Sequence, residues 1–317
     1  MTRRESGDQA FDHDGLYGTE REMPYSGTRS FLRRRFSRDL DGVDFAVLGV
    51  PFDLATSGRS GARMGPNALR NASSQVGWGG EVWPWGLDPF ATLAVVDYGD
   101  VNYHRGRAEQ MLENTAAVAG RIVAAGAGVI GLGGDHLVTY PLLKAHAETH
   151  GPLALVHFDA HRDTADSPYL DHGTFVHHAM RDGLIDPARS IQIGIRTQYD
   201  HTDPITVLYR PWVRHNGVQA VIDEITRVTA GAPAYLTFDI DSMDPAFAPG
   251  TGTPVSDGLT PGEVFDILRG LKDSPVRFVG MDLVEVAPAY DSAEITALLG
   301  ATLIQEFLCL CAHHRKG

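Results

Sequence analysis

Two segments of the sequence place acidic residues and a histidine at alternate positions directly after an apolar run. Asp159, His161 and Asp163 follow the first run, and Asp239 and Asp241 stand at the end of the second. Such a run is typical of a buried strand in a parallel sheet, in which residues two apart lie on one face. Each set of side chains can therefore converge at one strand end. Since burying so many carboxylates without a cation would be costly, the pattern predicts a metal cluster and a metalloenzyme.

His136 is a further candidate ligand because it follows Gly133-Gly134, where the backbone can turn sharply and approach a neighbour closely. Taken alone, Gly-Gly-Asp-His also fits a turn with a capping Asp and a surface histidine. A phosphate-binding loop is disfavoured, since no Gly-Lys-Ser/Thr follows. Beside the two carboxylate segments, we interpret His136 as a metal ligand.

The candidate ligands offer oxygen and imidazole donors and no thiolate. They are His136, Asp159, His161, Asp163, Asp239 and Asp241. Such hard donors favour Mn²⁺, followed by Mg²⁺, Fe²⁺ or Co²⁺, over a structural Zn²⁺ site. Six side chains are too many for one ion that keeps an open position. The sequence therefore predicts two ions that share bridging carboxylates and hold one hydroxide.

Apolar runs alternate with helical patterns along the chain, which predicts an α/β fold whose parallel sheet is covered by helices on both faces. The expected strands are 45–50, 93–97, 128–131, 153–158, 191–195, 205–208, 234–239 and 277–285, and the expected helices are 107–125, 137–149, 174–182, 217–230, 261–271 and 292–312. In such sheets the ligand site lies outside the carboxyl ends of the strands. The candidate ligands fall at these ends, and Glu285 ends the last strand.

The composition limits the partners that the chain can have. Lys and Arg number 27 and Asp and Glu number 40, a formal net charge of −13. This charge argues against nucleic acid or an anionic membrane and suits a cationic substrate. The longest apolar stretch, 116–134, is interpreted as a helix followed by a strand rather than a membrane span. Cys309 and Cys311 are expected as buried, unpaired residues of a terminal helix. With a polar N-terminus, these features predict a cytoplasmic protein.

The chain is expected to form an arm and one domain. Residues 1–40 are polar and charged and include Arg33-Arg34-Arg35, which predicts a solvated N-terminal arm that could pack on a neighbouring subunit. No convincing linker divides the rest, so residues 41–317 are expected to form a single catalytic domain.

From Gly27 onward the chain resembles the ureohydrolases, and within that family the bacterial agmatinases. The motifs that carry the resemblance are Gly133-Gly134-Asp135-His136, the segment 158–163, the segment 239–254, Gly65-Pro66 with Arg70, Asp171-His172-Gly173-Thr174, and the segment 285–291. The resemblance implies a three-layer αβα fold around an eight-stranded parallel sheet. It also implies two Mn²⁺ ions per chain, hydrolysis of a guanidinium to urea, and a homo-oligomer, either a trimer or a hexamer.

The resemblance further implies a role for each site residue. One ion would be held by His136, Asp159, Asp163 and Asp239, and the other by Asp159, His161, Asp239 and Asp241, so that Asp159 and Asp239 bridge. The hydroxide between the ions would attack the guanidinium carbon. The catalytic residues would be His172, which carries protons, Glu285, which pairs with the guanidinium, and Asp163. Taken alone, His172 also fits a turn hydrogen bond, and Glu285 a carboxylate bound to a helix N-terminus.

One segment departs from the pattern of the arginases, which use Asn and Ser before the shuttle histidine to bind the α-carboxylate and α-amine of their substrate. Here residues 164–171 contain no Asn, Ser167 is not in the arginase context, and the acidic residues would repel an α-carboxylate. The implied substrate is therefore agmatine, hydrolysed to urea and putrescine. The alternatives are guanidinobutyrase or another amidinohydrolase, a non-catalytic guanidine- or polyamine-binding protein, and a metal-stabilised structural protein. The last two are disfavoured because no ligand is missing and His172 and Glu285 accompany the set.

Overall fold

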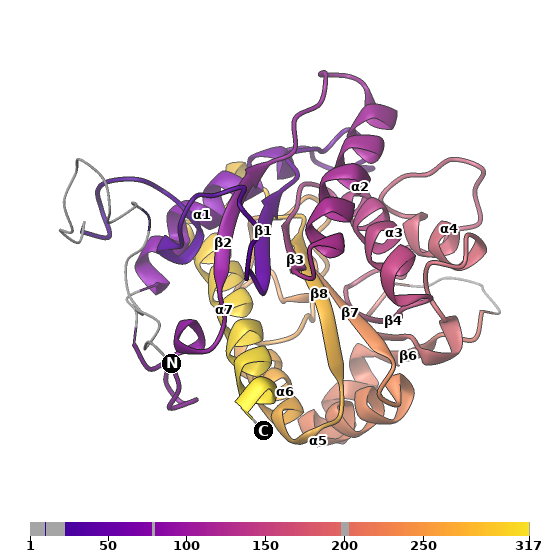
Figure 1. Cartoon of the computed structure of the whole chain (residues 1–317). Helices are drawn as coiled ribbons and strands as arrows, with labels where there is room; N and C mark the ends of the chain where they lie inside the picture. The colour runs from indigo at the N-terminus through magenta and orange to yellow at the C-terminus, as the bar shows by residue number, and fades with distance from the viewer. Residues whose placement is uncertain (1–9, 11–22, 78–79, 198–202, 317) are drawn as a thin grey trace.

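The computed structural model is built around one parallel sheet (Figure 1). It describes residue 10 and residues 23–77, 80–197 and 203–316. The strands are β1 (Phe45–Gly49), β2 (Val95–Asp100), β3 (Gly128–Leu132), β4 (Ala154–Phe158), β5 (Ile191–Ile195), β6 (Thr206–Tyr209), β7 (Pro233–Asp239) and β8 (Arg277–Val284). Their order across the sheet is β2-β1-β3-β8-β7-β4-β5-β6, and each neighbouring pair is parallel. The predicted α/β fold is confirmed, and the expected strand bounds differ from the observed ones by three residues at most.

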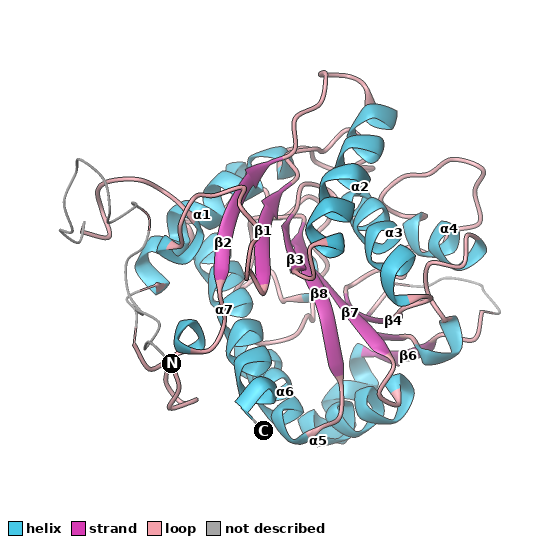
Figure 2. Ribbon diagram, in the orientation of Figure 1, coloured by secondary structure: helices cyan, strands magenta, loops and turns pink. Residues whose placement is uncertain are grey.

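Helices cover both faces of the sheet (Figure 2). The described α-helices are α1 (Gly65–Val76), α2 (Ala108–Ala124), α3 (Thr139–His150), α4 (Phe175–Arg181), α5 (Arg210–Thr229), α6 (Pro261–Gly270) and α7 (Ile295–Lys316). One hydrophobic core lies between the sheet and α2, α3 and α4, and a second lies between the sheet and α1, α5, α6 and α7. The strands are apolar on both faces for this reason. In β1, for example, Val47 belongs to one core and Ala46 and Leu48 to the other.

Two helices differ from the sequence-based expectation. Sequence patterns do not predict α1, because five of its 12 residues are Gly, Asn or Ser, which are poor helix formers. The helix forms in the folded protein because Leu69 and Ala72 are buried in the core that α1 shares with α7. The helix α5 begins at Arg210 rather than at residue 217, and the expected start is a break in the helix, where Gly217 has a φ of 80°.

The segment before β1 is packed on the chain itself. Phe31 and Leu32 are fully buried, and Arg33 and Arg34 are nearly so. The Phe31 amide donates to Asp97 Oδ2 at 2.8 Å, so this segment is tied to β2. The expectation of a solvated arm is therefore wrong for these four residues. Residues 1–9 and 11–22 of the expected arm lie outside the described residues, and a domain boundary near residue 40 stays a prediction.

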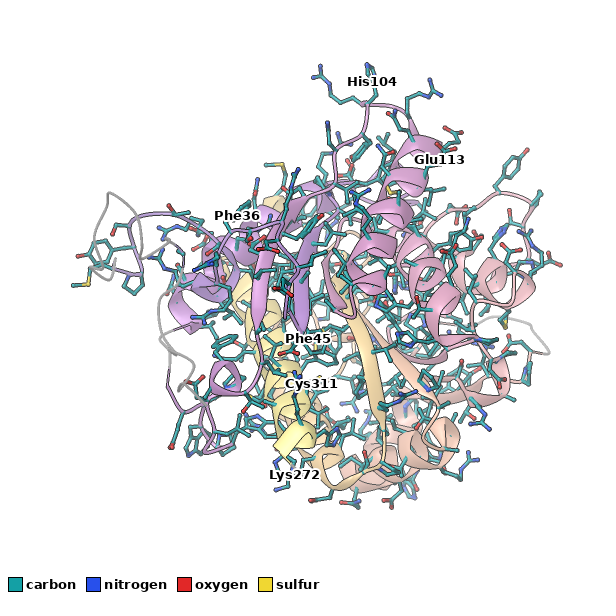
Figure 3. All side chains as sticks on the ribbon, viewed as in Figure 1. Phe36, Phe45, His104, Glu113, Lys272 and Cys311 are labelled. Carbon is teal, nitrogen blue, oxygen red and sulfur yellow. The ribbon has the colours of Figure 1, made fainter. Side chains whose placement is uncertain are left out.

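The helix α7 is the most apolar long helix of the described chain. By length and composition alone its residues Ile295–Arg315 could cross a membrane, but 72% of the apolar window is buried inside the fold. As expected, the stretch 116–134 is a helix followed by a strand, because it contains the end of α2 and all of β3. Cys309 and Cys311 are unpaired and Cys309 is buried, as predicted, but Cys311 is only partly buried, contrary to the expectation. Cys311 and Phe45, labelled in Figure 3, line one surface pocket beside the amino end of β1.

The loop that follows β3 runs between the ends of two other strands. The Gly134 amide donates to the Val50 carbonyl at 3.0 Å, and the Gly134 carbonyl accepts from the Glu285 amide at 2.8 Å. Neither Gly133 nor Gly134 has a positive φ. Close approach is therefore the reason for glycine here, since a Cβ at residue 134 would lie 1.8 Å from the Phe52 carbonyl oxygen.

We expect Gly134→Ala to lower the free energy of unfolding by about 1–3 kcal/mol, because the Phe52 backbone must move to admit the methyl group. Denaturant unfolding followed by circular dichroism measures the change. Gly120→Ala is the matched control: this glycine lies inside α2, where an added Cβ meets no atom within 4 Å beyond the helix's own backbone, and alanine there should stabilise by about 0.5–1 kcal/mol. Equal stability of both variants would contradict the close-approach explanation.

Candidate metal centre and active site

The strands that carry the candidate ligands are neighbours at the middle of the sheet. β3, β8, β7 and β4 lie side by side, although they are far apart in the chain. Their carboxyl ends bring together His136 after β3, Glu285 after β8, Asp239 at the end of β7 and Asp159 after β4. The residues before Asp159 and Asp239 are paired in the β4–β7 ladder, so these two carboxylates stand at the same level on adjacent strands.

His136 lies among three buried carboxylates. Its Nδ1 is 3.0 Å from Asp159 Oδ2, 3.1 Å from Asp163 Oδ2 and 3.2 Å from Asp239 Oδ2. The ring is fully buried, and Nδ1 makes no well-formed hydrogen bond to any described residue. One nitrogen and three carboxylate oxygens therefore converge on one point, as the ligands of a metal ion do.

A second group of ligand atoms adjoins the first. His161 Nδ1 is 3.1 Å from Asp241 Oδ2 and 3.4 Å from Asp159 Oδ1. Asp159 belongs to both groups, because its Oδ2 faces His136 and its Oδ1 faces His161. Asp241 is held in place by the Ala160 amide, which donates to Oδ1 at 3.1 Å, and by the Thr253 hydroxyl, which donates to Oδ2 at 3.0 Å. All six predicted ligands are thus brought together.

The far nitrogen of His136 fixes which form of the ring is present. Nε2 lies 2.9 Å from Thr237 Oγ1, and the Thr237 hydroxyl donates to Asp282 Oδ1 at 2.6 Å. Since the hydroxyl proton goes to Asp282, the threonine oxygen accepts from His136 Nε2–H. In the neutral ring the lone pair is then on Nδ1, which faces the three carboxylates and can bind a metal ion.

The charges at the site are not balanced by the protein alone. Burial and repulsion from Asp241 and Asp159 raise the pKa of Asp239 well above its ordinary value. Burial and the charge of Asp159 likewise raise the pKa of Asp241. Burial opposes ionisation of Asp159 too, but the close imidazoles of His136 and His157 lower its pKa well below its usual range. Divalent cations between these oxygens would remove the conflict, and a set of carboxylates and imidazoles without thiolate fits them.

Glu285 connects the metal-ligand group to His172. Its Oε1 accepts from the His136 amide at 3.0 Å and lies 3.1 Å from His172 Nδ1. Its Oε2 is buried and has no hydrogen-bond partner among the described residues. Glu285 and Asp163 have φ values of 63° and 52°, which are unfavourable for residues with side chains. Such strain is concentrated at functional sites, where it aims a side chain that regular geometry would direct elsewhere.

Two opposing influences act on the His172 ring. Burial lowers its pKa, but the Glu285 carboxylate beside Nδ1 outweighs burial and raises the pKa to about 9. On the other side, the Ser57 amide donates to Nε2 at 2.9 Å, which requires an unprotonated nitrogen. The amide contact is the stronger guide to the ring in this geometry, since a backbone N–H can only donate. A cation beside Glu285 would offset the negative charge of this carboxylate, which is what favours protonation of His172.

Comparison with known proteins assigns the chain to a family. The model of the arginase family matches residues 43–310. The chain belongs to the arginase family. An agmatinase from Chromobacterium violaceum is 52% identical over 310 residues, which cover 96% of this chain and 95% of that protein. The crystal structure of a hypothetical agmatinase from Burkholderia thailandensis superposes with a TM-score of 0.92 at 50% identity and covers 98% of both chains. The proclavaminate amidino hydrolase of Streptomyces clavuligerus has a TM-score of 0.86 at 35% identity, over 92% of this chain and all of its own.

Membership of the arginase family confirms the predicted fold and enzyme class. These enzymes are hydrolases that act on guanidino C–N bonds and depend on a binuclear metal centre. Among the residues that the structure describes, the carboxylate and histidine groups above can hold such a centre.

Sequence patterns did not single out several buried polar residues that lie directly below the ligands in the strands. His157 and Thr237 precede Asp159 and Asp239 by two positions and so lie on the same face of their strands. With Asp282 on β8 they are fully buried polar residues within otherwise apolar strands. That combination, a polar residue two positions before a ligand in a buried strand, was the available signal.

We expect Thr237→Val to weaken Mn²⁺ binding by about 10–100-fold, the usual cost of losing the hydrogen-bond partner of a ligating histidine. Valine keeps the shape of threonine but leaves His136 Nε2–H without an acceptor. Titration calorimetry of the metal-free protein measures the affinity. Thr237→Ser, which keeps the hydroxyl, should bind Mn²⁺ nearly as well as the unmodified protein. An unchanged affinity in Thr237→Val would show that this bond does not prepare Nδ1.

Proposed function

We propose that this chain hydrolyses agmatine to urea and putrescine with two Mn²⁺ ions. The observation that carries the proposal is the buried, unpartnered Oε2 of Glu285 beside the metal-ligand cluster and His172. A carboxylate in this position can accept the N–H groups of a planar guanidinium and fix its orientation. The 52% identity to an agmatinase over nearly the whole chain supports the same substrate.

The ligand assignment is the one that the family resemblance implies, and the two groups of side chains support it. His136, Asp159, Asp163 and Asp239 would hold one ion, and Asp159, His161, Asp239 and Asp241 the other. The support is clearest for Asp159 as a bridge, since its two oxygens face two different imidazoles. When bound, such ions lower the pKa of water so that hydroxide is available near neutral pH. Mn²⁺ is favoured because the donors are oxygen and imidazole and both cysteines lie elsewhere, on α7.

The protein side of the reaction is orientation and proton transfer. Glu285 Oε2 would hold the guanidinium, while Oε1 stays bonded to the His136 amide, so that the carboxylate itself does not move. Expulsion of the amine requires a proton, and His172 is the group beside Glu285 that can exchange one. Glu285 favours the protonated ring and the Ser57 amide favours the neutral ring, a balance that would suit a group that accepts and then donates a proton.

The segment 164–171 supports a substrate without a carboxylate. It contains no Asn that could donate to an α-carboxylate. Its two aspartates lie in different surroundings. Asp171 accepts a hydrogen bond from the Gly173 amide within its own loop, whereas the Asp166 side chain is 95% exposed. Solvent screens an exposed charge strongly, so the missing donor is the weightier argument, and repulsion adds to it. The 35% identity to proclavaminate amidino hydrolase favours another amidinohydrolase as the second candidate.

The remaining expectations about cellular context are part of this proposal. Two unpaired cysteines fit a reducing compartment, and we therefore propose a cytoplasmic location. Assembly into a trimer or a hexamer stays a prediction from the family resemblance.

Agmatine should be hydrolysed at least about 10²-fold better than arginine, because a site without a partner for a carboxylate leaves that charge unpaired. 4-Guanidinobutyrate should also be poor, since its carboxylate lies at the end where agmatine has an ammonium. The measurement is kcat/KM for urea release from the three compounds with Mn²⁺-loaded protein. A preference for either carboxylate-bearing compound would exclude agmatine as the substrate and favour the second candidate.

His172→Ala should retain both metal ions and the fold but lose about 10²–10⁴-fold in kcat, the usual contribution of general acid–base catalysis. Elemental analysis and single-turnover urea release separate the two effects. Asp159→Asn is the contrasting variant, because a bridging ligand serves both ions and its loss should release metal. If His172→Ala lost metal as Asp159→Asn does, the ring would be a ligand and not a proton shuttle.

A further inference from the structure

A row of polar side chains crosses the sheet directly below the metal ligands. Gln192 on β5 pairs with His157 on β4, His157 pairs with Thr237 on β7, and Thr237 pairs with Asp282 on β8. All four residues are fully buried. The Thr237–Asp282 half of the row supports His136, as described above. The other half, Gln192 and His157, has no role in the proposed function.

His157 lies against the carboxylate that faces both metal groups. Its Nε2 is 2.7 Å from Asp159 Oδ2, the oxygen that also lies 3.0 Å from His136 Nδ1. Two interpretations are open on distance alone. His157 could be a third imidazole ligand, since its nitrogen lies within the cluster of ligand atoms. Alternatively, it could donate a hydrogen bond to Asp159 and bind no metal.

The Gln192 amide decides between these interpretations. Arg162 Nε can only donate, and it lies 2.6 Å from Gln192 Oε1, whereas the Arg162 carbonyl can only accept, and it lies 2.7 Å from Gln192 Nε2. Arg162 therefore holds both ends of the amide and fixes its orientation. The arginine is itself fully buried and is held by Asp203, whose oxygens lie 2.9 and 3.2 Å from Nη2.

The fixed amide determines where the proton of His157 lies. Gln192 Nε2 is 3.0 Å from His157 Nδ1, and since this nitrogen of the amide can only donate, Nδ1 must accept. The proton of the neutral ring is then on Nε2, where it points at Asp159 Oδ2. A nitrogen that carries a proton has no lone pair for a metal ion.

We propose that His157 is a positioning residue that holds Asp159 for the two metal ions and is not itself a metal ligand. The proposal rests on the proposed metal centre. The bond from Nε2–H fixes the rotation of the Asp159 carboxylate, so that Oδ2 faces His136 and Oδ1 faces His161. Arg162 and Gln192 hold the imidazole in the required form. Phe175 packs against the edge of the same ring and against His136, which excludes water from this side.

The first test is the Mn²⁺ affinity of the full chain, measured by titration calorimetry. His157→Leu should weaken binding by about 10–100-fold while the number of ions per chain at saturation stays two. His157→Gln, whose amide can donate near the position of Nε2, should recover part of the affinity. The matched control is His146→Leu, which removes another fully buried histidine, on α3, whose ring contacts the backbone of Leu142 and Val129 and is no part of the metal-ligand group. This control should keep the affinity even if its melting temperature falls.

The second test reads the position of the proton directly. In nitrogen-15 spectra of the metal-free protein, the His157 signals, assigned by their absence in His157→Leu, should show a protonated Nε2 and an unprotonated Nδ1. Gln192→Glu, which replaces the donor by an acceptor of the same shape, should place a proton on Nδ1 and weaken Mn²⁺ binding. A metal affinity in His157→Leu equal to that of the unmodified protein would overturn the proposal. So would saturation at one ion in both His157 variants, or an unprotonated Nε2.

These readouts are independent of the substrate. If the unmodified chain bound two Mn²⁺ ions but released no urea from agmatine, the proposed function would fail while the role of His157 could still be confirmed or refuted by affinity and spectrum. If it released urea and His157→Leu kept full Mn²⁺ affinity, only the positioning role would fail.

Discussion

The mutual repulsion of buried carboxylates is the constraint on which the rest of this structure depends. Asp159, Asp239 and Asp241 are almost completely buried at the carboxyl edge of the sheet, and Asp163 is nearly so. Two imidazoles stand among them, but burial and repulsion still raise the pKa of Asp239 and Asp241. A fold that keeps such a group together at neutral pH needs cations, and the convergence of oxygen and nitrogen atoms on two points shows where they can bind.

The sheet meets this constraint by placing a second layer of polar groups under the first. The period of two along a strand puts His157 and Thr237 directly below Asp159 and Asp239. These residues give the ligands fixed hydrogen-bond partners, which orient Nδ1 of His136 and the oxygens of Asp159 without a bound metal ion. The cost is several polar groups inside an apolar sheet, which is tolerated because each has a partner.

The chemistry beyond metal binding depends on a backbone that departs from regular geometry. The left-handed conformation of Glu285 turns its side chain back from the end of β8, so that Oε1 meets the His136 amide and Oε2 is left open. The loop of Gly133 and Gly134 contacts the ends of β1 and β8 closely and so fixes the position of Glu285. The same few residues thus connect the metal-ligand group, the carboxylate that can receive a guanidinium, and the histidine that can exchange protons.

The sequence by itself indicated the strands and the six candidate ligands. The strands and five of the candidates follow from short-range patterns, because an apolar run is buried and alternate residues share a face. His136 was added because it follows two glycines. The sequence could not predict α1, whose Gly, Asn and Ser residues form a helix only because Leu69 and Ala72 pack in the core, nor the burial of Phe31 and Leu32. The strand order was likewise decided only by tertiary structure, and with it the meeting of β3, β8, β7 and β4. His157 and Gln192 acquire their meaning from that order. A buried polar residue has a role only through its partner, and the partner lies on another strand, far away in the chain.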